Sequence, residues 1–497
     1  MELYELPKGW VWTRLVDACQ YLPTGVEKFD EDIEYYSTGS IHGTSYVPEG
    51  IYSFSERPSR ANRMGHKRDV LQARMAGTNK ALLIGENLDN KLFSTGFIQL
   101  RAFNCCVGMS SYIHYYVQSR KFLAQRDALA TGSTQVALTD SRAEQITFPL
   151  SPLPEQHRIV SKIEEQFTKL DAGVEALKKV KTQLKRYRQS VLKSTMEGKL
   201  TEKWREEHKH KFEPASALLE KIKEERKKNT KEKYKELPPV DTENLPELPK
   251  GWCWVRVGEI SEMIQYGTSE KAGNDSSGIP VLRMGNIQDG KLLFEDLKYF
   301  PRDWLRLDDF ILHDGDVLFN RTNSAELVGK TAVYKSHYPT ALFASYLIRV
   351  NVNRNAYIPD VLSFFINSFY GRKYIASVVS QQVGQANVNG TKLSLMPIPF
   401  SPLPEQHKIV EEIEKRFTVA DEGEKAVEKS LKQAERLRQS ILKKAFEGKL
   451  VPQDPTDEPA SVLLERIKKE KEKLDADRKV KRKGRRVKKK KFLKQRS

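Results

Sequence analysis

The sequence predicts an α+β protein with two tandem domains of mixed α/β type, each followed by a long α-helix. A module of about 250 residues occurs twice in the chain. Apolar residues recur every seven positions through two long segments, which is typical of a coiled-coil seam. Elsewhere, short apolar runs alternate with Gly and Asn turns, which predicts strands with a few helices. We expect the two long helices to pair as an antiparallel coiled coil, giving a pseudo-two-fold internal repeat.

The duplication is visible in four segments that return in the same order. Between residues 151–200 and 401–450, 28 of 50 positions are identical without a gap. A whole module has therefore been duplicated, unlike the short units of solenoid proteins. The four segments are LPKGWVWTRL (6–15) with LPKGWCWVRV (248–257), SPLPEQHRIV (151–160) with SPLPEQHKIV (401–410), EGKL (197–200) with EGKL (447–450), and PASALLEKIKEE (214–225) with PASVLLERIKKE (459–470).

The repeat sets the expected domain boundaries. A proline-rich linker, LPPVDTENLPELP (237–249), separates the modules. The expected parts are a first domain (1–150), a long helix (151–200), a charged helix with the linker (201–247), a second domain (248–400), a second long helix (401–450), a shorter charged helix (451–477) and a disordered basic tail (478–497).

The long helices have recognisable ends and one apolar seam each. Pro152 and Pro154 prevent an earlier start, and Pro154 suits the first helical position, where its missing N–H costs nothing. Gly198 and Gly448 favour the left-handed residue that follows a helix. The predicted seam comprises Ile163, Phe167, Leu170, Val174, Leu177, Leu184 and Val191 in the first helix, and Ile413, Phe417, Ala420, Val427, Leu431, Ala434 and Ile441 in the second.

Charge is distributed very unevenly along the chain. The formal net charge is +18, but residues 478–497 contain 13 basic and no acidic side chains. The two predicted domains are therefore close to neutral, and net charge alone does not identify them as nucleic-acid binding. Such a basic block is expected to be disordered. Weak, sequence-independent phosphate binding and a purely solubilising role both remain open for it.

Composition excludes several protein classes. No apolar run approaches the roughly 18 residues that a membrane span needs, and the N-terminal residues do not have the pattern of a secretory signal. The four cysteines show no CxxC or disulfide-framework spacing. We therefore expect a cytoplasmic protein in a reducing environment.

Two short patterns occur in both predicted domains. Residues 69–74 and 316–321 both read DVLxxR, with the arginine just after a buried strand. Gln135 and Asn387 each lie three residues after a glycine. Arginine can bind guanine through two hydrogen bonds, and Asn or Gln can do the same with adenine, while other basic residues suit phosphate contacts. The candidate DNA-binding residues are Arg60, Lys67, Arg74, Asn79, Lys80, Gln135, Arg283, Asn286, Arg321, Asn323, Lys330 and Asn387, with Arg63 and Arg68 as further phosphate contacts.

These motifs, in this order and repeated, resemble the specificity subunits of type I restriction–modification systems. The resemblance covers nearly the whole chain except the basic tail. It rests on LPKGWVW, PLPEQHRIV, EGKL and PASVLLERIKKEKEK, together with IPVLRMGNIQDGK (279–291) and GDVLFNRTNSAELVGKTAVY (315–334) in the second domain, and DVLQARMAGTNK (69–80) and FSTGFIQLR (93–101) in the first.

The resemblance implies a division of labour between subunits. The two domains would be target-recognition domains that each read one half of a bipartite double-stranded DNA site, and the long helices would set the spacer. The helices would also dock two modification subunits, which carry S-adenosylmethionine and methylate adenine. Restriction subunits, where present, would use ATP and Mg. This chain would then be non-catalytic and bind no cofactor or metal itself.

The residues themselves agree with a chain that has no chemistry of its own. No N/D-P-P-Y/F loop of an amino-methyltransferase occurs, and the Gly329-Lys330-Thr331 string lacks the first glycine of a phosphate-binding loop, because that position is Ser324. Two other hypotheses remain open at this point. One is a coiled-coil scaffold that binds proteins and does not recognise DNA sequence; the other is a single-chain enzyme with fused nuclease or methylase activity.

Overall fold

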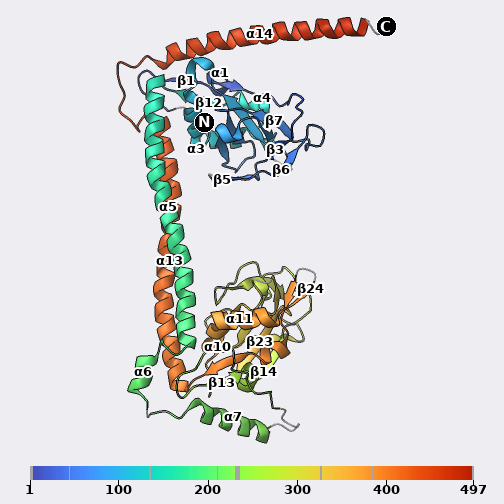
Figure 1. Cartoon of the computed structure of the whole chain (residues 1–497), viewed down its shortest axis with the longest axis vertical. Coiled ribbons are helices and arrows are strands. Elements are labelled where there is room, and N and C mark those ends of the chain that lie inside the picture. The colour runs from blue at the N-terminus through green and yellow to red at the C-terminus, as the bar shows by residue number, and fades with distance from the viewer. Residues whose placement is uncertain are drawn as a thin grey trace. The chain divides into compact units, whose positions relative to one another are not determined.

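The computed structural model describes residues 4–43, 45–133, 136–209, 211–229, 236–324, 327–382 and 385–494. The chain divides into two compact units (Figure 1). Unit 1 comprises residues 1–177 and 429–497, and unit 2 comprises residues 178–428. Each of the two long helices therefore contributes one part to each unit.

The long helices are α5 (Leu153–Met196) and α13 (Leu403–Phe446). In unit 1, Asp171 of α5 forms an ion pair with Arg438 of α13. In unit 2, Arg188 of α5 forms an ion pair with Asp421 of α13. Later residues of one helix thus face earlier residues of the other, so the helices are antiparallel. The predicted antiparallel pairing is confirmed, and the repeat extends to the ion pairs, because Arg188 and Asp421 are the repeat counterparts of Arg438 and Asp171.

An aromatic ring accompanies each of these ion pairs. The guanidinium of Arg438 lies 4.2 Å from the ring centre of Phe167, and that of Arg188 lies 5.1 Å from the ring centre of Phe417. Such contacts add cation–π attraction to the ion pair. Along the predicted seam, Ile163, Phe167, Val191, Ile413, Ala420, Val427 and Ile441 are buried, and Leu170, Val174, Leu177, Leu184, Phe417, Leu431 and Ala434 are half-buried.

Glycines end both long helices in the left-handed conformation. Gly198 and Gly448 each have a φ of 67°. A Cβ atom at Gly448 would lie 2.2 Å from Cγ of Pro7 in unit 1, and one at Gly198 would lie 2.1 Å from Cγ of Pro249 in unit 2. The EGKL segment therefore repeats because each glycine provides a backbone turn and a close contact with the LPKGW segment of the same unit.

We expect Gly448→Ala to lower the free energy of unfolding of unit 1 by more than about 1 kcal/mol, because an L residue is strained at this φ and its methyl group would collide with Pro7. Gly173→Ala is the matched control, since Gly173 lies within α5 and nothing approaches its Cβ position within 4 Å. The control should raise stability by about 0.5–1 kcal/mol. Denaturant unfolding measures both changes, and a Gly448→Ala protein as stable as the parent would refute this account.

Unit 1 contains the first globular domain, which has two four-stranded sheets. Its elements are β1 (Val11–Arg14), α1 (Leu15–Ala18), β2 (Gln20–Tyr21), β3 (Ile33–Tyr36), β4 (Ile41–His42), β5 (Ser45–Tyr46), β6 (Gly50–Tyr52), β7 (Ala61–Gly65), β8 (Val70–Ala73), β9 (Ala81–Leu83), η1 (Glu86–Leu88), β10 (Lys91–Ser94), β11 (Phe97–Arg101), η2 (Asn104–Cys106), α2 (Met109–Tyr116), α3 (Arg120–Leu129), α4 (Asp140–Ala143) and β12 (Thr147–Leu150).

Unit 2 contains the second globular domain and the helices α6 (Glu202–Glu207) and α7 (Ala215–Asn229). The elements of this domain are β13 (Cys253–Arg256), α8 (Val257–Ile260), β14 (Ser261–Tyr266), β15 (Ile279–Leu282), η3 (Met284–Asn286), β16 (Ile287–Gln288), β17 (Lys291–Leu292), β18 (Lys298–Phe300), α9 (Leu307–Phe310), β19 (Val317–Asn320), β20 (Thr322–Asn323), β21 (Thr331–Val333), β22 (Leu342–Phe343), β23 (Leu347–Val352), α10 (Pro359–Asn367), α11 (Phe369–Val378), β24 (Ser380–Gln382), β25 (Gln385–Asn387), α12 (Gly390–Ser394) and β26 (Pro397–Phe400).

The two domains share one sheet topology. The order β2-β11-β8-β9 in unit 1 matches β14-β23-β19-β21 in unit 2. In both domains the first and last strands pair, β1 with β12 and β13 with β26. The register also matches, because Leu71 lies opposite Gln99 and Leu318 lies opposite Arg349. This correspondence lets each residue near β8 be compared with one near β19.

The opening segment of each module is tied to the start of a long helix. The indole nitrogen of Trp10 donates to Glu155 over 2.8 Å in unit 1, and that of Trp252 donates to Glu405 over 2.8 Å in unit 2. The core of unit 1 continues from the first domain into α5, α13 and α14, and the core of unit 2 likewise continues into α5, α7 and α13. The LPKGW and PLPEQ motifs thus recur together because they form one joint between a domain and a helix.

The structure corrects the prediction for the C-terminal segments. The shorter charged helix, α14, begins only at Ala460, after three prolines, and it continues to Lys494. The predicted disordered tail (478–497) is therefore helical over 478–494, and residues 495–497 lie outside the described residues. Lysine and arginine are good helix formers, and the single glycine, Gly484, costs only about 1 kcal/mol. In the described part of the chain, no helix is both long and apolar enough to cross a membrane.

Candidate nucleic-acid interface

The DVLxxR motifs form the buried inner strands β8 and β19. All four residues of each strand are buried. The aspartate of the motif precedes the strand and the arginine follows it, so the two side chains lie at opposite ends. A four-residue strand spans about 13 Å. The motif therefore provides two separate polar sites in each domain, an aspartate end and an arginine end.

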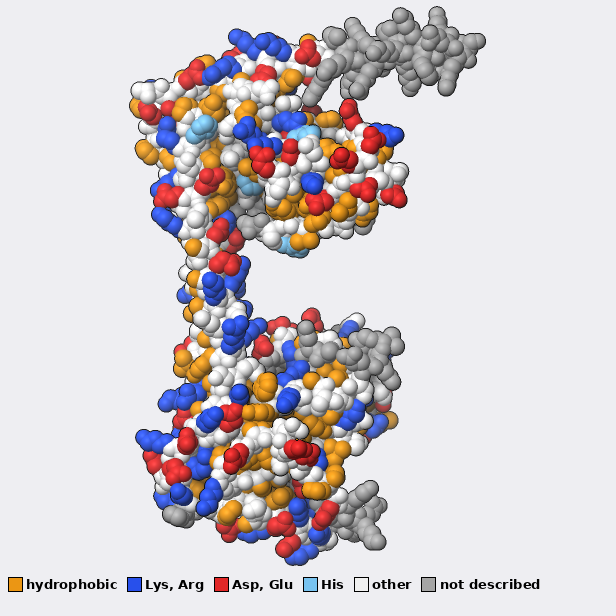
Figure 2. Space-filling model, in the orientation of Figure 1, with side chains coloured by type: hydrophobic (Ala, Val, Ile, Leu, Met, Phe, Trp, Pro, Cys, Tyr) orange, Lys and Arg blue, Asp and Glu red, His pale blue; other side chains and the backbone are white. Residues whose placement is uncertain are grey.

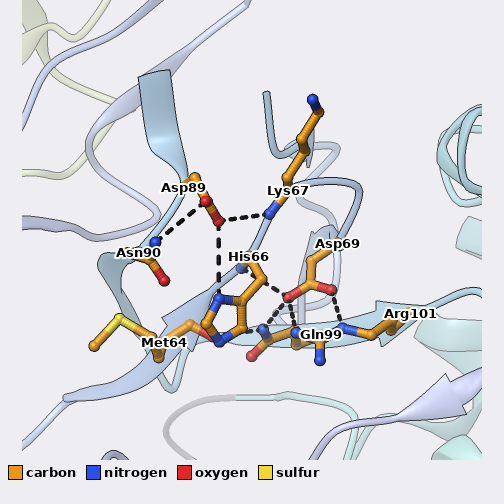
Figure 3. Close-up of polar contacts among 8 residues, drawn as sticks. All are labelled: Met64, His66, Lys67, Asp69, Asp89, Asn90, Gln99 and Arg101. Carbon is orange, nitrogen blue, oxygen red and sulfur yellow. Dashed lines mark hydrogen bonds and ion pairs between the residues drawn. The ribbon is translucent and has the colours of Figure 1, made fainter. Parts of the chain in front are cut away.

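The aspartate end has a structural role. Asp69 is fully buried and accepts hydrogen bonds from Nε (2.6 Å) and Nη2 (2.8 Å) of Arg101 and from Nε2 of Gln99 (2.6 Å), all on β11 (Figure 3). The backbone N–H of His66 donates to the same carboxylate over 3.0 Å. These bonds fix the turn between β7 and β8, because a buried carboxylate is stable only when it is paired and hydrogen-bonded.

The second domain repeats this arrangement with exchanged partners. Asp316 accepts hydrogen bonds from Arg349, Asn351 and the backbone N–H of His313. By sheet register, Arg349 corresponds to Gln99 and Asn351 corresponds to Arg101. The guanidinium and the amide have exchanged places while the carboxylate has stayed, so the motif aspartate organises the sheet in both domains.

The arginine end of unit 1 is closely bonded. Arg74 donates through Nε to the carbonyl oxygen of Phe97 over 3.1 Å, and its Nη2 lies 2.5 Å from a carboxylate oxygen of Asp140. Tyr21 donates to the same carboxylate over 2.7 Å. Burial opposes ionisation of Asp140, but the Tyr21 hydrogen bond and the Arg74 charge outweigh it and lower the pKa of Asp140. Arg74 thus joins β2, β8 and α4, and little of its guanidinium is free for a base.

The arginine end of unit 2 is more loosely bonded. The guanidinium of Arg321 lies 4.7 Å from the ring centre of Tyr266, and its two hydrogen bonds, to Ser345 and to Asn387, are both 3.5 Å long. Nε of Arg321 is enclosed and has no partner. Asn387 also donates to the hydroxyl of Thr322 over 3.0 Å. The structure therefore brings together Arg321 and Asn387, two candidates predicted 66 residues apart.

Several other candidates lie at these arginine ends. In unit 1, the carbonyl oxygens of Arg60 and Lys80 accept hydrogen bonds from Thr95 and Ala73, and the Lys80 ammonium donates to Thr38 over 2.7 Å. In unit 2, Asn323 lies on β20, which pairs with the β25 strand that contains Asn387. The exposed Asn79 precedes Lys80, and the carbonyl oxygen of Lys330 accepts a hydrogen bond from Asn320 at the end of β19.

The remaining candidates do not join these groups. Lys67 and Arg68 lie at the aspartate end, where the backbone of Lys67 donates to Asp89 over 2.8 Å (Figure 3). Arg283 is half-buried, and its guanidinium donates to the carbonyl oxygen of Asp296. Gln135 lies outside the described residues.

Two predicted contact residues lie in the interior instead. Asn286 is buried, accepts a hydrogen bond from the backbone of Arg283 over 2.9 Å, and donates to the carbonyl oxygens of Leu293 and Glu295 over 2.8 Å each. It therefore shapes the η3 turn. Arg63 is 1% exposed, and burial followed by the nearby Arg74 charge lowers its pKa to about 10. Sequence could not show this, because the burial depends on tertiary contacts such as the hydrogen bond from Arg63 to the carbonyl oxygen of Leu22, 41 residues away.

Exposed apolar side chains surround both arginine ends, and sequence reasoning missed them. In unit 2, Tyr266, Met284, Leu327 and Tyr346 are 37–44% exposed. The carbonyl oxygen of Tyr346 accepts a hydrogen bond from the backbone of Arg321, and that of Met284 accepts one from Asn320. In unit 1, Met75 and Val136 are each 43% exposed beside Arg74. Clustered exposed apolar groups mark binding surfaces, so the arginine ends combine apolar and hydrogen-bonding groups.

On the face shown in Figure 2, acidic and basic side chains are interspersed over each unit. Among the described residues, no group of three His, Cys, Asp or Glu side chains could hold a metal ion.

A family model described as "Type I restriction modification DNA specificity domain" matches residues 7–186 and 249–433. The chain belongs to this family. Each match begins at an LPKGW segment and ends within a long helix, so the two family domains coincide with the two modules. The family match supports the hypothesis of a specificity subunit over the hypothesis of a scaffold that does not recognise DNA sequence.

Individual relatives agree with this assignment. The chain is 28% identical over 507 residues to the type I restriction enzyme EcoKI specificity subunit of Escherichia coli K12. This alignment covers 95% of this chain and 97% of the relative. It is 26% identical to the StySPI specificity subunit of Salmonella potsdam over 72% of this chain and 71% of the relative. A solved structure has the same fold as this chain, with a TM-score of 0.64 and 22% sequence identity. It comes from work on complex assembly and conformational transition of the type I R-M system. The match covers 90% of this chain and 100% of that chain.

Proposed function

We propose that this chain is the non-catalytic subunit that recognises a bipartite site on double-stranded DNA through its two domains. One observation carries the proposal. The two domains share the order of the inner sheet and the buried aspartate that precedes β8 and β19. The side chains that contact the motif arginine differ, however: they are Asp140 and Tyr21 in unit 1, and Tyr266 and Asn387 in unit 2. A constant framework with different polar and apolar groups at one place suits two modules that read two different half-sites.

The chemistry is assigned to partner subunits. We propose that two modification subunits dock on this chain, bind S-adenosylmethionine and methylate adenine in each half-site. Restriction subunits would add ATP- and Mg-dependent steps. The site of action would be host DNA in the cytoplasm. This chain contributes binding and orientation, in keeping with the structural use of the buried carboxylates Asp69 and Asp316.

The long helices are proposed to fix the spacer between the half-sites. Both α5 and α13 contribute to both units. The repeated ion pairs of Arg438 with Asp171 and of Arg188 with Asp421 hold the helices in one register. A single helix register would restrict the spacing of the two half-sites that the chain recognises.

Selection from random duplexes tests the proposal in solution. The chain, co-purified with its modification subunit, should enrich sequences with two short fixed blocks separated by a gap of constant length and free composition. A protein-binding scaffold would enrich no sequence, although the complex would still form. One continuous block would also contradict the proposal, because it would leave one domain without a target.

A further inference from the structure

The second half of α14 differs sharply in charge from the first half. Residues 460–477 contain five basic and five acidic side chains, whereas residues 478–494 contain twelve basic and none acidic. Helix α7, the counterpart of α14 in the first module, contains five basic and three acidic side chains over its whole length. The basic segment is therefore absent from the first copy of the repeat.

The first half of α14 is firmly attached to the first domain. Ala460, Leu463 and Ile467 are buried in the core of unit 1. The carboxylate of Glu470 accepts hydrogen bonds of 2.9 Å from the backbone N–H groups of Asn104 and Cys105. Beside it, Lys471 forms an ion pair of 2.9 Å with Asp17. The basic segment thus begins directly after a fixed anchor, and Figure 1 shows that α14 continues beyond the globular part of this unit.

The charge density of the segment matches that of duplex DNA. Seventeen helical residues span about 25 Å at about 1.5 Å each, so twelve charges give roughly one positive charge per 2 Å. Double-stranded DNA carries one negative charge per about 1.7 Å of its axis. A segment without acidic residues and with this density releases many counterions when it lies along a phosphate backbone, which drives binding without sequence preference.

We propose that residues 478–494 of α14 form a sequence-independent binding site for the phosphate backbone of duplex DNA, attached to the first domain through the first half of this helix. The choice of DNA among polyanions rests on the proposed function, which already places the chain on a duplex. Attachment to a domain that is itself bound raises the local DNA concentration, so the segment need bind only weakly alone. It adds affinity to any duplex and leaves the recognised sequence unchanged.

The test measures binding of the complex with its modification subunits to a short duplex that lacks the recognised sequence, over a series of salt concentrations. Three variants are compared with the full chain. One ends at Asp477, one replaces the 13 Lys and Arg residues of 478–497 by Gln, and one keeps their composition in scrambled order.

The truncated and Gln variants should bind this duplex at least tenfold more weakly at low salt. Each phosphate contact contributes about 0.9 to the magnitude of the slope of log K against log salt concentration, so six contacts would contribute about 5. The magnitude of this slope should therefore be smaller by several units for the truncated and Gln variants than for the full chain. The scrambled variant should behave like the full chain. An unchanged slope after truncation overturns the proposal. Loss of binding on scrambling also overturns it, because the contact would then depend on the order of the residues and not on their charge alone.

The same series separates this proposal from the proposed function. A duplex with the selected bipartite sequence should be preferred to the same degree by all four proteins. If none of them, including the full chain, prefers it, the proposed function has failed, while the difference in slope between full and truncated chains still reports on the basic segment.

Discussion

Arg321→Ala is expected to weaken specific DNA binding by about 10- to 100-fold and to relax the requirement for one base pair in one half-site. A guanidinium that bonds a guanine through two hydrogen bonds contributes about 1–3 kcal/mol of discrimination. Arg321 is suited to this role because its present hydrogen bonds are long and Tyr266 supports its plane. Binding to duplexes that vary at each position of the site measures the effect, with the melting temperature as a check of folding.

Arg74→Ala is the matched control, because it removes the equivalent arginine from the first domain. Its guanidinium is held by Asp140 and the carbonyl oxygen of Phe97. Its loss should therefore lower the stability of unit 1 and weaken binding at all positions of one half-site together. If Arg321→Ala left both the recognised sequence and the affinity unchanged, Arg321 would not read a base.

Lengthening both long helices by one heptad is expected to lengthen the spacer by about three base pairs without changing either half-site. Seven residues add about 10 Å to a helix, and base pairs are about 3.4 Å apart. The insertions belong after Leu177 in α5 and after Leu431 in α13, because the ion pairs of Lys181 with Glu428 and of Arg438 with Asp171 place these positions opposite each other. The sequence of methylated sites gives the spacer directly.

Insertion into α5 alone is the control for this experiment. It would break the register between Arg188 and Asp421 or between Asp171 and Arg438, so methylation should be lost and no new spacer should appear. An active double-insertion protein with the original spacer would show that the helices do not set the distance.

The repeat made most of the fold predictable from sequence. Both long helices, their glycine ends and the antiparallel seam follow from local rules, since a heptad pattern and a residue such as Gly448 specify structure without knowledge of distant contacts. The tail was predicted wrongly over 478–494 because charge repulsion was weighed and the helix propensity of lysine and arginine was not.

The arginine ends were only partly predictable. The DVLxxR motif identified Arg321, and the amide pattern identified Asn387, but only tertiary structure shows that the two side chains meet. The same motif suggested an equal role for Arg74, whereas the distant Asp140 and Tyr21 engage it. Exposure of Tyr346 and burial of Asn286 depend on how strands and turns pack, which no local pattern records.

The central claim, that two domains on one chain read a bipartite site, is tested most directly by mapping methylated adenines. This chain and its modification subunit would be produced together in a host without other adenine methylation, and the genome sequenced by a method that detects the modified base. The account predicts one motif of two unlike blocks separated by a gap of fixed length. Methylation at a single continuous motif, or none despite a stable complex, would contradict it.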